Sequence, residues 1–136
     1  MADATVLIYH MSEERMRMLK ALCVSMGIRA AAVDRGMERA PVGLLSGLVN
    51  PVKLTQGASG RMKEIRGPQE IDEEMIVMAG FTEALFNDFL DRMKRIPLQI
   101  DLKAVQTETN LYWSGEMLQA ELKRERELYR SMMKER

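Results

Sequence analysis

One pattern occurs twice in this chain, and it constrains the fold more than any other feature. The stretches VLIYHMSEERMRMLKALCVSMGIRAAAV, from Val6, and IVMAGFTEALFNDFLDRMKRIPLQIDLK, from Ile76, align without a gap at a spacing of 70 positions. Each begins with a short apolar run, continues with apolar residues at helical spacing, and ends in a second run typical of a strand. Together they predict two strand–helix–strand units, as an internal repeat over residues 5–34 and 75–104. Chance similarity of two unrelated units is the alternative to a duplication.

The start and the end of each predicted helix carry the same signals. A hydroxyl residue followed by acid, Ser12 in the first unit and Thr82 in the second, is typical of a helix N-cap. The side-chain oxygen of such a residue accepts a hydrogen bond from a free amide, and the acids favour the positive end of the helix dipole. Gly27 and Pro97 end the two helices at equivalent positions.

Two such units predict an α/β fold with a small, mainly parallel four-stranded sheet and helices packed on it. The second strands are expected at residues 28–33 and 98–103, and each connection joins parallel strands. At 136 residues the chain forms one domain, with a core that needs no disulfide or metal. Residues 53–72 are expected to be a linker between the units, with a mobile lid as the alternative.

A C-terminal helix is expected over residues 114–134. Its charged face, KRERE, is interpreted as a solvated surface, and its tail is expected to project beyond the domain. The predicted packing stripe consists of Met117, Leu118, Leu122, Tyr129 and Met132.

Charge and cysteine content exclude several classes of function. Twenty basic residues balance twenty acidic ones, so no overall field directs the chain to nucleic acid or to an anionic membrane. Cys23 is the only cysteine and His10 the only histidine, which excludes an internal disulfide and any multi-cysteine or multi-histidine metal site. No apolar run approaches the roughly 20 residues of a membrane helix. We therefore expect a cytoplasmic protein with no cofactor, no metal, no nucleic-acid partner and no membrane span.

Polar residues at the predicted strand ends mark one candidate ligand site. If the first strands of both units are adjacent, in the order 2-1-3-4, their carboxyl ends meet at one crevice beside the loop after the fourth strand. Two helix N-termini would then face the same small anion, such as a phosphate or a carboxylate. This crevice requires the two strand ends to lie side by side. The residues expected to line it are His10, Ser12, Gly80, Thr82, Lys103, Thr107 and Asn110.

These residues also have structural interpretations. Thr107 and Asn110 are typical of turns and caps, and Lys103 can be an exposed-face residue. His10 lacks a partner that would make it a general base. Trp113, just before the C-terminal helix, is placed like the apolar partner of a hydrophobic staple. The motifs of phosphate loops, dinucleotide sites, zinc peptidases and serine hydrolases are absent, so we assign no catalytic residue.

The second unit resembles a known protein family. The resemblance rests on MIVMAGF from Met75, LKAVQTETN from Leu102, and a tryptophan followed by a charged helix. In these features residues 74–128 are similar to the bacterial family "domain of unknown function 3783". The family implies a cytosolic protein with no assigned activity, and the resemblance implies no catalytic role. Its most distinctive positions here are Lys103, Ala104, Val105, Thr107, Asn110 and Trp113.

Three functions fit the sequence. The first is a non-catalytic ligand-binding or regulatory module that accepts a small anion in the crevice. The second is a protein-interaction module, in which the half-exposed fourth strand, the methionine-rich faces and the C-terminal helix form a homodimer or bind another partner. The third is an enzyme with His10 as acid/base and Lys103 as electrostatic stabiliser, but the sequence does not supply the further groups that catalysis needs.

Overall fold

The fold alternates strands and helices, as the repeated pattern predicts. The computed structural model describes residues 4–47 and 71–134, so nearly all of the expected linker at 53–72 lies outside the described residues. The elements are β1 (Thr5–Tyr9), α1 (Glu13–Ser25), β2 (Arg29–Ala32), the short 3-10 helix η1 (Arg35–Met37), α2 (Val42–Ser46), β3 (Met75–Ala79), α4 (Glu83–Lys94), β4 (Leu102–Val105) and α5 (Gly115–Lys134).

The sheet has the expected strand order but not the expected strand directions. Its order is β2-β1-β3-β4. Within each unit the two strands are parallel, whereas the central strands β1 and β3 are antiparallel. The sheet is therefore mixed, and the prediction of a mainly parallel sheet is wrong. Both central strands are buried on both faces, and an apolar run of this kind does not record the direction of its neighbour.

The antiparallel pairing of β1 with β3 is symmetric between the two units. Leu7 pairs with Val77, its equivalent 70 positions later, and this pair lies at the centre of the ladder. The flanking pairs, Thr5 with Ala79 and Tyr9 with Met75, exchange under the same equivalence. One unit is therefore turned by about half a revolution relative to the other.

The predicted helix starts are confirmed in both units. The amide N–H of Arg15 donates to Ser12 Oγ (3.3 Å), and that of Leu85 donates to Thr82 Oγ1 (3.1 Å). The spacing of 70 positions does not hold for the last strands, because β4 starts 73 positions after β2. Leu98 and Ile100 are buried in the core but belong to an irregular segment outside the sheet ladder. Their alternation with polar residues reflects this inward packing, not the strand expected at 98–103.

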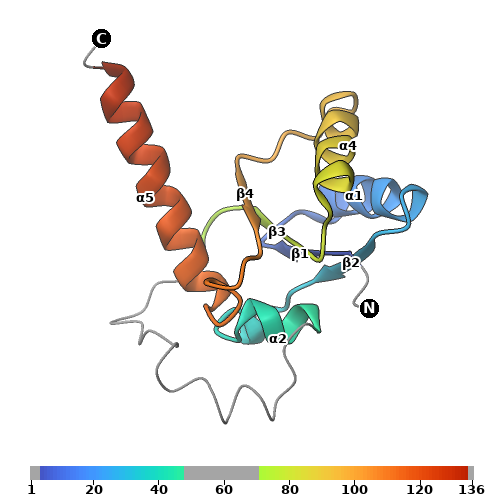
Figure 1. Ribbon diagram of the computed structural model, residues 1–136, viewed down its shortest axis with the longest axis horizontal. Coiled ribbons are helices and arrows are strands. Elements are labelled where there is room, and N and C mark those ends of the chain that lie inside the picture. The colour runs from blue at the N-terminus through green and yellow to red at the C-terminus, as the bar shows by residue number, and fades with distance from the viewer. Residues whose placement is uncertain (1–3, 48–70, 135–136) are drawn as a thin grey trace.

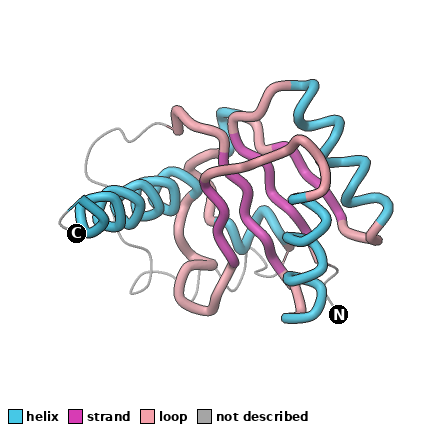
Figure 2. The backbone as a smooth tube through the Cα atoms, turned by 90° about the horizontal axis from the view of Figure 1, so that it is seen from above, coloured by secondary structure: helices cyan, strands magenta, loops and turns pink. Residues whose placement is uncertain are grey.

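The sheet separates two apolar cores, because successive side chains of a strand point to opposite faces. Val6 and Ile8 of β1 face the core formed with α1 and α4, whereas Leu7 and Tyr9 face the core formed with α2 and the first turns of α5. Figure 1 shows α1 and α4 on one side of the sheet and α2 on the other. The result is three layers, with the four strands side by side in the middle (Figure 2).

The helix α5 begins as predicted and then leaves the domain. Ser114 caps it, since the amide N–H of Met117 donates to Ser114 Oγ (3.1 Å). Leu118 is buried against the sheet, but Tyr129 and Met132 are 65% and 66% exposed. The predicted packing stripe therefore does not extend to these two residues, whereas the tail projects beyond the domain as expected. Both views show the second half of α5 extending away from the sheet (Figures 1 and 2).

Candidate functional site

The seven residues expected at one crevice lie at two ends of the sheet. Because β1 and β3 are antiparallel, His10 and Ser12 follow β1 beside the start of β3, whereas Gly80 and Thr82 follow β3 beside the start of β1. Strands of five residues place these ends about 17 Å apart, at about 3.4 Å per residue. The two capped helix N-termini do not converge, and the common crevice is not formed.

An ion pair shows where the first helix begins relative to the second unit. Arg15 lies in the first turn of α1, and its Nε donates to Oε2 of Glu74 (2.7 Å), the residue directly before β3. Its guanidinium also donates to the carbonyl of Gln99 (2.6 Å), and the hydrogen bond to Glu74 raises the pKa of Arg15. This N-terminus therefore adjoins the beginnings of β3 and β4, not their carboxyl ends.

The remaining expected residues belong to β4 and to the loop that follows it. Thr107 and Asn110 bind each other reciprocally: the amide N–H of Thr107 donates to Asn110 Oδ1 (2.8 Å), and the amide N–H of Asn110 donates to Thr107 Oγ1 (3.1 Å). Asn110 Nδ2 also donates to the carbonyl of Val105 (3.0 Å), and Lys103 Nζ donates to the carbonyl of Ile100 (2.5 Å). These bonds make the loop a brace between β4 and the chain that leads to α5, as the structural interpretation predicts.

The brace is joined to α2 through the main chain. The amide N–H of Val42 donates to the carbonyl of Trp113 (2.8 Å), and that of Gly43 donates to the carbonyl of Leu111 (2.7 Å). Pro41 and Ser114 form a β-bridge next to these bonds. Because Ser114 caps α5, the brace fixes where α5 begins.

Close contact with β1 also fixes the first turn of α5. A Cβ at Gly115 would lie 2.4 Å from the ring atom Cε2 of Tyr9, so this position admits only glycine without a shift. Tyr9 is fully buried, and its hydroxyl has no hydrogen-bond partner among the described residues. Burial, followed by the nearby Glu38 carboxylate, raises the pKa of Tyr9. The phenol is neutral at physiological pH and serves as a packing surface for α5.

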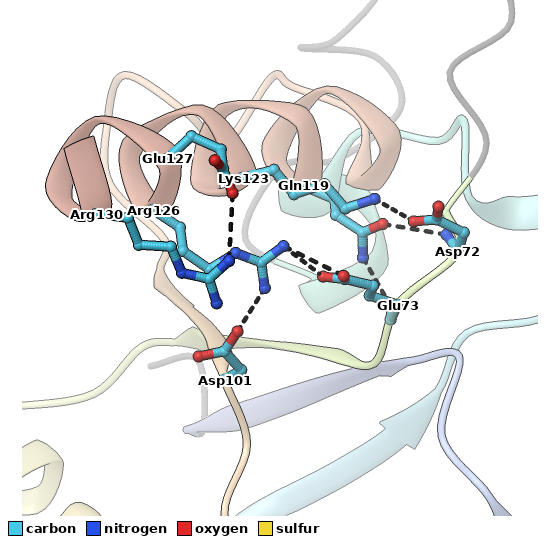
Figure 3. A network of polar contacts seen from close by, with 8 residues as sticks. All are labelled: Asp72, Glu73, Asp101, Gln119, Lys123, Arg126, Glu127 and Arg130. Carbon is cyan, nitrogen blue, oxygen red and sulfur yellow. Dashed lines mark hydrogen bonds and ion pairs between the residues drawn. The ribbon is translucent and has the colours of Figure 1, made fainter. Parts of the chain in front are cut away.

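Gln119, Lys123 and Arg126 anchor the first half of α5 through polar contacts (Figure 3). Gln119, almost fully buried, accepts from the amide N–H of Asp72 (3.1 Å) and donates to the carbonyl of Glu73 (2.7 Å). Lys123 pairs with Asp72, and this hydrogen bond lowers the pKa of that carboxyl.

Arg126 completes this anchor, because it connects two separate chain segments. Its guanidinium pairs with Glu73 (3.0 Å), before β3, and with Asp101, before β4. The hydrogen bonds to these acids raise the pKa of Arg126. Charge-assisted bonds of this type are directional, so they fix the angle at which α5 leaves the sheet. The sequence interpretation of KRERE as a solvated face missed this anchor. The sequence feature that could have indicated it is the presence of basic residues on α5 together with acidic residues just before two of the strands.

A surface groove of about 380 Å³ separates β4 from α5. Lys103, Thr107 and Asn110 of the expected site all line it, together with apolar side chains that include Trp113. From α5 it is lined by Leu118, Glu121, Leu122 and Glu125.

The face of α5 that lines this groove continues onto the exposed end of the helix. Leu118, Leu122, Glu125, Tyr129 and Met132 recur at alternating spacings of four and three residues, the spacing of a coiled-coil seam. Beyond Arg126 the apolar side chains have no cover from the described part of the chain. These side chains, which we call the α5 tip, are Leu128 (57% exposed), Tyr129 (65%), Met132 (66%) and Met133 (53%).

The described residues contain neither a cluster of metal ligands nor an exposed thiol. Within residues 4–47 and 71–134, no cluster of three or more His, Cys, Asp and Glu side chains could hold a metal ion. Cys23 is buried in the core, and burial raises the pKa of its thiol to about 11. His10 is exposed, with a backbone φ of 56°. In the same ranges, no helix combines the length and the apolar character of a membrane span.

Comparison with known proteins bears on the second unit and α5. No curated protein and no solved structure matches the chain. The family match begins one residue before β3 and ends at Tyr129, within the α5 tip. It contains the brace, the groove and the anchoring residues Gln119, Lys123 and Arg126. Residues 74–129 match the model of a protein family described as "Domain of unknown function (DUF3783)", which confirms the resemblance and makes this part of the chain similar to that family.

Proposed function

We propose that this chain is a non-catalytic oligomerisation module, in which the α5 tip binds the same surface of a second copy. The observation that carries the proposal is an apolar helix end held away from the domain by a fixed base. Four large apolar side chains are exposed within six residues, and burying a side chain of this kind fully contributes about 1.5–3 kcal/mol. Clustered apolar exposure of this kind marks interaction surfaces.

The anchor at the base of α5 supports binding by the tip. Lys123 and Arg126 hold the helix to acids before β3 and β4, so the direction of the tip is set before a partner arrives. A surface that is already ordered loses less conformational entropy on association. The anchor therefore presents the tip to a partner in a defined direction.

The spacing of the seam favours a second copy as the partner. A stripe with alternating spacings of four and three packs best against another helix with the same repeat, and α5 itself supplies one. A symmetric dimer needs only this one self-complementary patch. The formal net charge of zero means that two copies do not repel each other through their overall charge. Because the tip spans only about two turns, the dimer is expected to be weak and dependent on concentration.

Sedimentation equilibrium over a wide range of concentrations tests this function. The double variant Tyr129→Glu, Met132→Glu places two charges in the contact, and Val24→Glu is the matched control, since Val24 on α1 is an exposed apolar side chain (78%) far from the tip in sequence. We expect the wild type and Val24→Glu to dimerise reversibly. The double variant should stay monomeric with an unchanged melting temperature. A wild type that is monomeric throughout, or a double variant that still dimerises, contradicts the proposal.

A further inference from the structure

We infer that the two copies pair with their α5 helices antiparallel, and that Glu125 selects this orientation. The inference rests on the proposed dimer. Glu125 occupies a seam position between Leu122 and Tyr129, so its carboxylate lies on the face that meets a partner helix.

Glu125 differs from the other acids in this part of α5. Glu121 pairs with Arg124 (2.6 Å) and Glu127 pairs with Arg130 (3.3 Å), whereas Glu125 has no ion pair among the described residues. It lines the groove beside β4 at the point where the tip begins. The energy of a carboxylate that has no ion pair in its own chain depends strongly on the charges that a partner brings near it.

A parallel pair would place each seam residue against its own copy. Glu125 would then face Glu125 of the second helix, and like charges that close disfavour one another. An antiparallel pair instead sets Tyr129 beside Met132 of the second copy. In that register the two Glu125 residues lie about 17 Å apart along the helix axis, at about 1.5 Å per residue, so their mutual repulsion is largely screened.

The shape of the molecule favours the same orientation. The layered domain lies at the base of α5, and the tip leads away from it (Figure 1). Parallel helices would bring both domains to the same end of the pair, whereas antiparallel helices place them at opposite ends. The antiparallel arrangement therefore joins the two tips without contact between the domains.

Spin labels on single introduced cysteines distinguish the two orientations. Ser131→Cys and Arg124→Cys are each labelled on the exposed side of α5, while the buried thiol of Cys23, with its raised pKa, does not react in the folded protein. With Tyr129 opposite Met132, two labels at position 131 lie close together. Two labels at position 124 are separated by about 20 Å along the axis, at about 1.5 Å per residue. A parallel pair would instead give equal, short distances at both positions.

A charge-only substitution tests the role of Glu125. We expect Glu125→Gln to add a population with a short distance at position 124, because it removes the repulsion that disfavours the parallel pair. Glu127→Gln, outside the seam on the same helix, should leave the distances unchanged. Equal short distances in the wild type overturn the antiparallel orientation, and unchanged distances in Glu125→Gln overturn the selecting role. Sedimentation of the labelled proteins as monomers would instead overturn the proposed dimer itself.

Discussion

His10 and Gly80 occupy equivalent backbone positions, each directly after the first strand of its unit. Both have a positive φ, 56° for His10 and 74° for Gly80. A residue with a Cβ loses about 1–2 kcal/mol in this left-handed region, whereas glycine does not. The chain therefore makes the same sharp turn before α1 and before α4, with a strained histidine in the first turn and an unstrained glycine in the second.

Substitutions at these two positions should have unequal effects on stability. We expect Gly80→Ala to lower the free energy of unfolding by about 1 kcal/mol, because alanine is strained at this φ. His10→Gly should change it by less than about 0.5 kcal/mol, since relief of the strain is offset by the greater freedom of glycine in the unfolded chain. Urea denaturation followed by circular dichroism measures both.

Gly36→Ala is the control for this pair. A Cβ at Gly36 would meet no atom within 4 Å, and its φ lies outside the left-handed range, so the variant should be neutral or slightly stabilised. If Gly80→Ala proved as stable as Gly36→Ala, strain would not be the reason for glycine at position 80.

The elements differ in how far local sequence determines them. The caps Ser12 and Thr82, and the helices that follow, are predicted correctly because their signals lie within one turn of chain. The direction of β3 against β1 is not, because the buried run from Ile76 pairs equally well with a parallel or an antiparallel neighbour. The late start of β4 has a similar cause, since Leu98 and Ile100 are inward-facing whether or not they belong to the ladder.

The candidate site is less predictable than the elements. Thr107 and Asn110 are polar residues in a loop, and composition alone does not distinguish a ligand site from a brace. Their hydrogen-bond partners are each other and the end of β4, which depends on the loop conformation. The α5 tip is difficult to predict for a different reason. The apolar spacing at Tyr129 and Met132 predicts a packed face of the helix, but it does not indicate at which residue the helix leaves the domain.

The brace after β4 can be tested by removing one side chain. We expect Asn110→Ala to lower the free energy of unfolding by about 1 kcal/mol, because the amide of Thr107 and the carbonyl of Val105 lose their partner. For a domain of this size that corresponds to about 4 °C in melting temperature. Thr109→Ala, at an exposed position of the same loop, is the matched control and should be neutral.

A ligand screen distinguishes the two interpretations of this loop, a structural brace and a binding site. In a thermal-shift screen with phosphates, nucleotides and carboxylates, a brace predicts that wild type and Asn110→Ala respond alike to each compound. A ligand that stabilises the wild type, and loses this effect in Asn110→Ala but not in Thr109→Ala, would instead make Asn110 a binding residue.

At the scale of the whole molecule, α5 couples the fold to the proposed interface. Its first turns belong to the core through Leu118. Its middle is held by ion pairs to acidic residues just before β3 and β4, and its end is exposed. The match to the family model, from Glu74 to Tyr129, covers the first two of these parts and reaches the beginning of the third. The anchor at Arg126 should therefore influence association although it lies outside the tip.

Substitution of the anchor should weaken the dimer without touching the contact surface. In Arg126→Gln, Glu73 and Asp101 lose their shared cation, so the exit angle of α5 is less fixed and ordering the tip on association costs more entropy. We expect a dissociation constant raised about tenfold, equivalent to about 1.4 kcal/mol, measured by sedimentation equilibrium. Arg124→Gln, which removes only an exposed intrahelical pair, should leave the constant unchanged. Equal dissociation constants for Arg126→Gln and wild type would mean that the tip binds independently of its base.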